Sequence, residues 1–210
     1  MLTPEEEEAT RKRLAEIGQE RIAIGLLKLQ SEEGELLRRL ASGNLSAVDE
    51  EAMRQRLAAV GQEKISLTIK ALGLEETELL RRLASGMLTP AEEEEIRRRL
   101  AAITQERIAL RLEALDLEEA ELMRRLASGL VPPEDEEALR KRLAEIGQER
   151  IQLKIDALDA EVAELMRQLA SGTLSEIEAE KLRRRLAEIE QEKLALKIEG
   201  LELEERELQR

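Results

Sequence analysis

The residues of this chain that are able to do chemistry are carboxylates, guanidinium and ammonium groups, hydroxyls and side-chain amides, because the sequence has no Cys, no His and no aromatic residue. Without His, the commonest general base and metal ligand are missing. Without Cys there is no thiolate nucleophile, no disulfide and no zinc–thiolate site. The lack of Phe, Trp and Tyr removes base-stacking platforms and aromatic cages. What remains is the chemistry of carboxylate clusters, basic patches and amides.

Acidic runs followed by basic triplets are the densest of these patterns. Glu92 to Glu95 precede Arg97-Arg98-Arg99, and Glu5 to Glu8 precede Arg11-Lys12-Arg13. Calcium loops need oxygens around a tight glycine turn, and di-metal bundles need Glu-x-x-His, so neither kind of metal site is predicted. The spacing instead predicts ion pairs one helical turn apart, namely Glu7–Arg11, Glu50–Arg54 and Glu93–Arg97.

Carboxylate pairs for glycoside chemistry are expected by chance among 47 acidic residues, and no aromatic sugar platform accompanies them. We therefore predict no enzyme activity, no cofactor, and no catalytic, cofactor-binding or metal-binding residue.

A glutamine followed by glutamate recurs at one position throughout the chain, as Gln19, Gln62, Gln105, Gln148 and Gln191. A polar residue within an apolar helix seam costs stability and fixes register, which is the structural interpretation. A polar lining for a small ligand or water chain is the alternative. Counting outward from the joints between repeats, described below, also predicts ion pairs between helices, namely Glu33–Arg56, Glu76–Arg99 and Glu119–Arg142.

The elements that position these residues are five near-copies of a 43-residue unit. The copies are residues 1–43, 44–86, 87–129, 130–172 and 173–210, which we interpret as one helical repeat domain over 1–210. Ala-Ser-Gly ends each of the first four copies, at Gly43, Gly86, Gly129 and Gly172. Glycine closes a helix in the left-handed conformation, and the Ser or Thr that follows caps the next helix. Thr3 with Glu6 and Thr89 with Glu92 have the spacing of capping boxes.

Each unit is predicted to form one helix of about 37 residues, antiparallel to its neighbours because the connections are short. The alternative splits each unit in two near Gly18, Gly61 and Gly147. Thr104 and Glu190 hold the same position in other copies, and neither favours a reversal of the chain.

Two apolar stripes run along each helix. In the fourth unit, the first seam is Leu139, Leu143, Ile146, Leu153, Ala157 and Ala160. The second seam is Ala144, Gly147, Ile151, Ile155, Leu158, Val162, Leu165 and Leu169. A helix with two seams has two neighbours, so the second seam of each unit is predicted to dock on the first seam of the next.

The terminal copies depart from this pattern. Thr10, Lys28 and Ser31 replace apolar residues on the first seam of unit 1, and Glu190 enters the second seam of unit 5. We take this to favour a finite array over an endless filament. The fold class is therefore all-α, with five long antiparallel helices in an up-down bundle or an open helical repeat array. A closed ring of five helices would place the first and fifth helices parallel, which no loop enforces.

Composition bounds the partners and the compartment. The net charge of -13 disfavours nucleic acid and anionic membranes, and no apolar run approaches the length of a membrane span. The first eight residues, Met1 to Glu8, are acidic and unlike a signal peptide, so a soluble cytoplasmic protein is expected. No partner is required, and self-association through the seams of the terminal helices stays open.

The Ser-Gly-x-Leu-Thr-Pro-Glu-Glu type of joint, the dipole-matched helix ends and the Ala/Leu/Ile seams resemble those of de novo designed helical repeat proteins. The likeness covers the whole chain and implies a scaffold rather than a catalyst. The alternatives are a binding module that offers a groove or seam to a partner helix and an apolipoprotein-like lipid binder. The latter class uses one broad apolar face rather than two seams.

Overall fold

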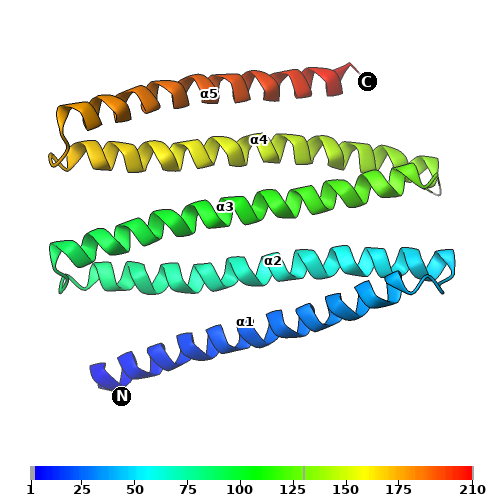
Figure 1. Cartoon of the computed structure of the whole chain (residues 1–210), viewed down its shortest axis with the longest axis horizontal. Coiled ribbons are helices and arrows are strands. Elements are labelled where there is room, and N and C mark those ends of the chain that lie inside the picture. The colour runs from blue at the N-terminus through cyan, green and yellow to red at the C-terminus, as the bar shows by residue number, and fades with distance from the viewer. Residues whose placement is uncertain (1–2, 130, 210) are drawn as a thin grey trace. The chain divides into compact units, whose positions relative to one another are not determined.

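A computed structural model describes residues 3–129 and 131–209, and within these ranges the chain forms five α-helices and no strand (Figure 1). The helices are α1 (Pro4–Ala41), α2 (Ala47–Ala84), α3 (Pro90–Ala127), α4 (Pro133–Ala170) and α5 (Glu176–Leu208). The predicted fold class is confirmed, with one helix per repeat. The alternative break near Gly18 is wrong, because α1 is continuous over 38 residues. Met1 and Leu2 of the acidic N-terminal segment lie outside the described residues, as does residue 130 of the fourth joint.

The joints fold as their sequence predicts. Gly43, Gly86, Gly129 and Gly172 have φ of 66 to 69°. This left-handed conformation is favourable only for glycine, and it reverses the chain at the end of each of the first four helices. At the start of α1 the capping box is present, since Thr3 and Glu6 each accept a hydrogen bond from the other's backbone N–H. Ser175 and Glu178 form the same box at α5. The fourth joint differs, because Pro132 offers no side-chain cap to α4.

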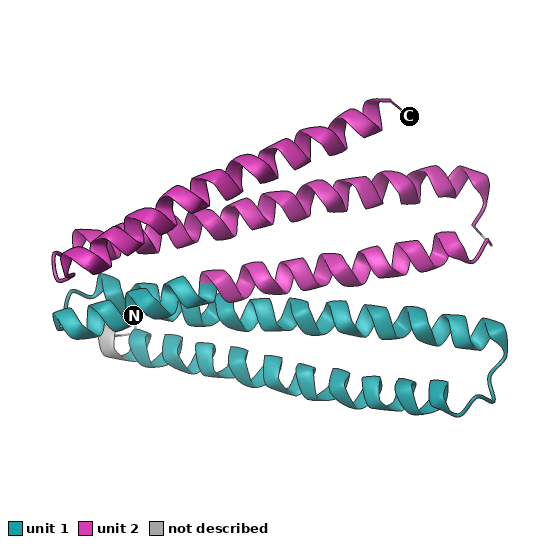
Figure 2. Ribbon diagram, turned by 45° about the horizontal axis from the view of Figure 1, so that its top comes forward, with its two compact units in different colours: residues 1–103 teal, residues 104–210 magenta. Residues whose placement is uncertain are grey.

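The chain divides into two compact units, residues 1–103 and 104–210, with the division inside α3 (Figure 2). The first unit holds α1, α2 and the start of α3, and the second holds the rest of α3 with α4 and α5. Successive helices within each unit are antiparallel. The organisation as one domain stays a prediction.

One position of the repeat supplies the most deeply buried side chain at every interface. Val60, Ile103, Ile146 and Ile189 are equivalent residues, one per helix from α2 to α5, and none has exposed surface. All four belong to the first seam. Among residues 6–129 and 131–209, the buried side chains are all apolar. No helix in that part of the chain is long and apolar enough to cross a membrane.

Candidate functional site: the interface between successive helices

The apolar part of the interface joins the second seam of one helix to the first seam of the next. Between α3 and α4, Ile146 is buried with Leu115 and Leu122 of α3. Leu139, Leu143 and Leu153, the other large residues of the first seam of α4, pack against this cluster. Leu115 and Leu122 belong to the second seam of α3, so the predicted docking of second seam on first seam is confirmed at this interface. Burying these side chains is the main favourable term for joining the helices.

The glycines in the middle of the helices allow leucines of the next helix to approach. A Cβ atom at Gly18 would lie 3.1 Å from Cδ1 of Leu74, and one at Gly25 would lie 2.9 Å from Cδ1 of Leu67. At Gly147 the corresponding distance is 3.3 Å, to Cδ1 of Leu203. Glycine costs a helix about 1 kcal/mol relative to alanine. The close contact with the leucine of the next helix explains why glycine is found at these positions.

An arginine that flanks the first seam forms a bidentate ion pair with a glutamate of the preceding helix, through two parallel hydrogen bonds. Arg142 donates from Nε and Nη2 to the two carboxylate oxygens of Glu118, at 2.7 and 3.0 Å. Its Nη1 donates to Glu149 of its own helix at 2.6 Å. The guanidinium group is planar and matches the carboxylate geometry, so this fork fixes both distance and register. The same fork, always 24 residues apart, joins Arg56 to Glu32, Arg99 to Glu75 and Arg185 to Glu161.

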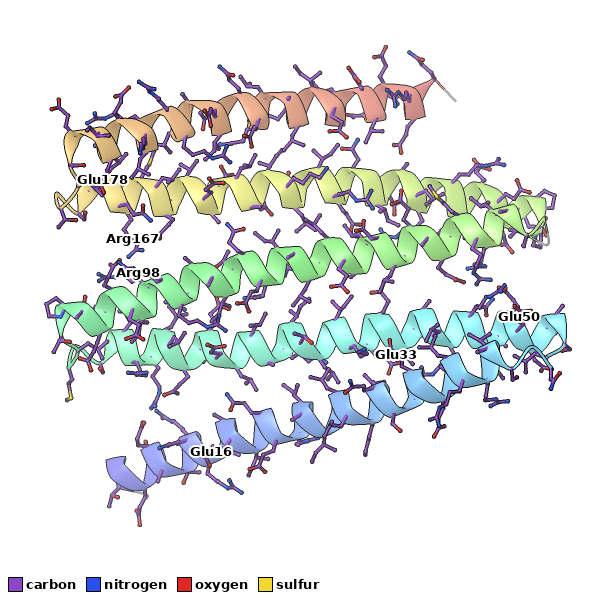
Figure 3. All side chains as sticks on the ribbon, viewed as in Figure 1. Glu16, Glu33, Glu50, Arg98, Arg167 and Glu178 are labelled. Carbon is purple, nitrogen blue, oxygen red and sulfur yellow. The ribbon has the colours of Figure 1, made fainter. Side chains whose placement is uncertain are left out.

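The predicted partners of these arginines were wrong by one residue. Arg56 contacts Glu32 rather than Glu33, and the same shift applies to Glu75 and Glu118. One residue along a helix is a rotation of about 100°, so counting from the joint gave the right level but not the right side of the helix. Glu33 lies on the side of α1 that faces α2 (Figure 3), where it pairs with Lys64 at 2.7 Å.

Lys64 belongs to a second set of interhelix pairs that the sequence analysis missed. Arg150 contacts both Asp116 and Glu119 of α3 at 2.5 Å, and Lys193 contacts Asp159 of α4 at 2.8 Å. The signal was present in the repeats, because a basic residue occupies this position in every copy, from Arg21 to Lys193. Aligning the copies would have found it.

Hydrogen bonding from the arginine fork lowers the pKa of two of the carboxylates, Glu32 and Glu75. The hydrogen bond from Arg56 lowers the pKa of Glu32, and the hydrogen bond from Arg99 lowers the pKa of Glu75. In both cases burial opposes the shift without reversing it. The carboxylates are thus held in the ionised form that the fork requires.

Two of the recurring glutamines, Gln105 and Gln148, form hydrogen bonds to the next helix. Gln105 donates from Nε2 to the backbone carbonyl of Ala157 at 3.1 Å, and Gln148 donates to that of Gly200 at 2.9 Å. Both bonds span 52 residues of the chain. The structural interpretation of these two glutamines is confirmed, because each one fixes the register of two helices.

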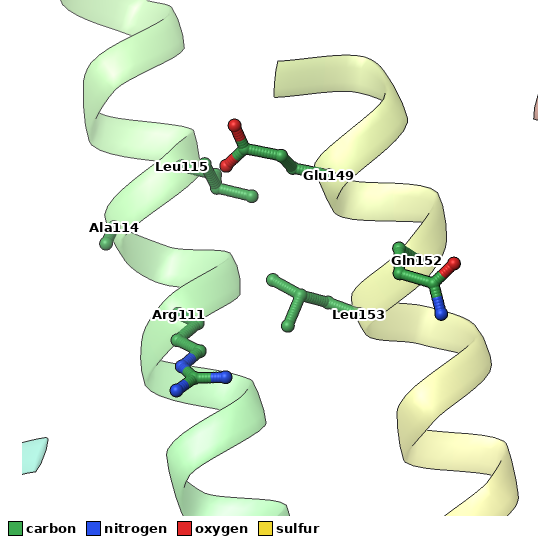
Figure 4. Close-up of a pocket in the computed structure, with 6 residues that line it drawn as sticks. All are labelled: Arg111, Ala114, Leu115, Glu149, Gln152 and Leu153. Carbon is green, nitrogen blue, oxygen red and sulfur yellow. The ribbon is translucent and has the colours of Figure 1, made fainter. Parts of the chain in front are cut away.

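Two shallow grooves follow the interfaces. One, of about 380 Å³, lies between α3 and α4, and Figure 4 shows Leu115 and Leu153 pointing into it from opposite sides. Its single carboxylate, Glu149, is already bound by Arg142. The other groove, of about 520 Å³, lies between α1 and α2, with an apolar floor that includes Leu67 and Leu74. The apolar floors offer contact area, and cationic side chains also line the grooves, Arg111 in the first and Arg21 and Lys70 in the second.

The acidic runs and basic triplets form the ion pairs that were predicted one helical turn apart, in addition to the interhelix pairs described above. The three predicted pairs are present, with N–O distances of 3.7 Å for Arg11–Glu7, 2.5 Å for Arg54–Glu50 and 2.8 Å for Arg97–Glu93. Across residues 3–129 and 131–209, no group of three or more carboxylates is arranged to hold a metal ion.

Comparison with known proteins gives no relative. No protein-family model matches the chain, and neither a curated protein nor a solved structure matches it.

Proposed function

We propose that this chain is a structural scaffold, which holds helices in a fixed arrangement and catalyses no reaction. The observation that supports the proposal is the use of the recurring polar groups. Arg142 and Arg150 are bound to carboxylates of α3, and Gln148 is bound to a carbonyl of α5. Side chains engaged in this way join helices and are not free to act on a substrate.

The resemblance to de novo designed helical repeat proteins belongs to this proposal. Its support lies in the uniformity of the helix ends, where glycine with positive φ and a Ser or Thr cap recur at joint after joint. Local choices that agree with the global fold are typical of idealised designs. A scaffold of this kind folds without a cofactor or partner.

The test is whether the purified chain is folded on its own. We expect full helicity by far-ultraviolet circular dichroism in plain buffer, unchanged by neutral phosphatidylcholine vesicles. The seams are narrow stripes rather than the single broad apolar face that lipid-binding helices use. Low helicity in buffer that rises with vesicles would instead identify a lipid-binding protein and overturn the scaffold proposal.

The variant pair Arg99→Met and Arg98→Met provides the matched control for the supporting observation. Arg99 joins α3 to Glu75 of α2, whereas Arg98 pairs with Glu94 of its own helix. If the recurring arginines serve the architecture, Arg99→Met lowers the urea midpoint and Arg98→Met leaves it nearly unchanged. Equal midpoints for the two variants would contradict the architectural role of the fork.

A further inference from the structure

The second seam of α5 is exposed although its residues are of the kind that is buried in the other helices. We call it the tail seam, and it consists of Ala187, Glu190, Leu194, Ile198, Leu201, Glu205 and Leu208. Leu194 is 59% exposed, whereas Ile151, its equivalent in α4, is 6% exposed. Ile198, Leu201 and Leu208 are also largely exposed. An apolar stripe of this length on a surface marks an interaction site.

The first seam of α1 is the complementary face and is also exposed. We call it the head seam, and it consists of Thr10, Leu14, Ile17, Ile24, Lys28 and Ser31. Ile17 is 38% exposed, whereas Val60, its equivalent in α2, has no exposed surface. Second seams dock on first seams at the interface between α3 and α4. The chain therefore carries one unpartnered face of each kind.

The register of the internal interfaces can be carried over to a tail seam placed on a head seam. Leu115 and Leu122 pack on Ile146 between α3 and α4. Their equivalents in the tail seam are Leu201 and Leu208, and the equivalent of Ile146 in the head seam is Ile17. The same apolar contact is thus available between the two ends.

Charges at the two ends match in the same register. Arg13 is the equivalent of Arg142 and bonds through Nη1 to Glu16 and Glu20 of its own helix, at 3.0 and 3.5 Å. Its Nε and Nη2, the atoms with which Arg142 grips Glu118, form no bond among the described residues. The equivalent of Glu118 is Glu204 of α5, which likewise has no partner in that part of the chain. The arginine of an unformed fork therefore lies on α1, and its glutamate lies on α5.

The remaining ties repeat this match. Arg21 holds the position of Arg150, and Glu202 and Glu205 hold the positions of its partners Asp116 and Glu119. The polar replacements in the two seams also correspond. Between α4 and α5, Gly147 faces Leu203. The residue of the tail seam equivalent to Gly147 is Glu190, and the residue of the head seam equivalent to Leu203 is Ser31, which follows Lys28 by three residues. A carboxylate in one seam is thus set opposite a hydroxyl and close to an ammonium group in the other.

The occupant that satisfies all these matches is a second copy of this chain. The internal register requires antiparallel helices, and a closed ring of five helices would place the first and last helices parallel. One chain cannot close the seam on itself in this register. We propose that the tail seam of one copy binds the head seam of another, head to tail, in a reversible association. Such a contact is heterologous and leaves a free seam at each end, so it extends the scaffold along a line of copies. In this arrangement the polar replacements in the terminal seams weaken the contact between copies without capping the array, in contrast to the finite array expected from the sequence.

The test uses variants that block one end each. Ile17→Glu places a buried charge in the docked head seam, and Leu201→Glu does the same in the tail seam. In the single chain Leu201 is 65% exposed and Ile17 is 38% exposed, so neither change opens a closed cavity, and the helicity of each variant by circular dichroism checks that it is folded. We expect the weight-average mass of the native protein, by sedimentation velocity, to rise with concentration up to about 1 mM. Each blocked variant should stay at the chain mass of 23.8 kDa.

The decisive sample is an equimolar mixture of the two variants. The free tail of the head-blocked variant can bind the free head of the tail-blocked variant, so the mixture should contain a species of twice the 23.8 kDa chain mass and none larger. Leu27→Glu is the matched control, because Leu27 is 65% exposed but lies off both seams, where other repeats have Lys70 or Glu113. That variant should associate like the native protein.

Charge reversal tests the register. Adding Arg13→Glu to the tail-blocked variant should weaken the mixed dimer several-fold, and adding Glu204→Arg to its head-blocked partner should restore it. A native protein that stays at its chain mass up to about 1 mM would overturn the proposal. So would a single blocked variant that still dimerises, since that contact would be symmetric. Neither result would affect the scaffold function, which is tested by the helicity of the chain alone.

Discussion

Replacing Ile146 by alanine is expected to destabilise the protein much more than replacing Ile17, although the two residues hold the same position in their repeats. Ile146 is fully buried with Leu115 and Leu122, whereas Ile17 lies on the seam of α1 that has no neighbour and is 38% exposed. The position within the repeat is the same, and so is the deleted group. Any difference in the loss of unfolding free energy between the two variants therefore measures the contribution of the neighbouring helix.

The magnitude follows from the atoms removed. The change from isoleucine to alanine deletes three carbons, each worth about 0.8 kcal/mol of burial, or about 2.4 kcal/mol in all at a fully buried site. The cavity left against Leu115 and Leu122 raises the loss at Ile146 to about 3–4 kcal/mol. At Ile17 the burial is partial, no closed cavity forms and alanine improves helix propensity, so the loss is about 1 kcal/mol or less.

Urea unfolding followed by circular dichroism measures both losses, at a protein concentration low enough to keep the chain monomeric. Hydrogen exchange then locates them, because contacts in a repeat array are between neighbours and Ile146→Ala should deprotect α3 and α4 first. Equal losses for the two variants would refute the reasoning, since the partner helix would then contribute nothing to the stability of this position.

Three further predictions concern the backbone, the fork and pH. Gly73→Ala should raise the free energy of unfolding by about 1 kcal/mol, because a Cβ there meets nothing within 4 Å, whereas Gly43→Ala, at a φ of 68°, should lower it by a similar amount, both read from urea midpoints. A double-mutant cycle of Arg142→Met and Glu118→Gln should give a coupling of about 0.5–1 kcal/mol, and a value near zero would contradict a fork that holds the helices together. The hydrogen bond from arginine lowers the pKa of Glu75 below the ordinary 4.5, so its contribution to stability is intact above about pH 4.5 and is lost as the pH falls through the lower folded-state value. Glu75→Gln should therefore reduce the acid-side slope of melting temperature against pH, and an unchanged slope would remove this linkage.

The helix ends were predictable because their causes are local. A glycine at each joint, a hydroxyl after it and a glutamate three residues later determine the stop, the start and the reversal without reference to any other part of the chain. The docking of second seam on first seam was predictable for a related reason, since two stripes on one helix require two neighbours. The fourth joint shows the limit, because Pro132 interrupts the pattern and its helix starts without a side-chain cap.

The partners of the arginines were not predictable to the residue. Whether Arg56 meets Glu32 or Glu33 depends on how far α1 is rotated about its axis, and that rotation is set by contacts such as that of Leu74 with Gly18. Sequence spacing gives the position of a residue along the helix axis but leaves its angular position about that axis uncertain by tens of degrees. The role of Gly18 was hidden for the same reason, since only the neighbouring leucine explains it.

Because the arginine fork has the same spacing at every joint, the number of repeats can change without altering the fork. Each fork joins residues 24 positions apart, across one joint, and involves no other repeat. Excising residues 87–129 would therefore bring α2 and α4 together with Glu75 opposite Arg142, the same pair of residue types in the same register. The shortened chain would have an even number of helices, so its two outermost helices would run in opposite directions. Deleting one repeat would thus change the number of helices from odd to even while leaving every retained interface intact.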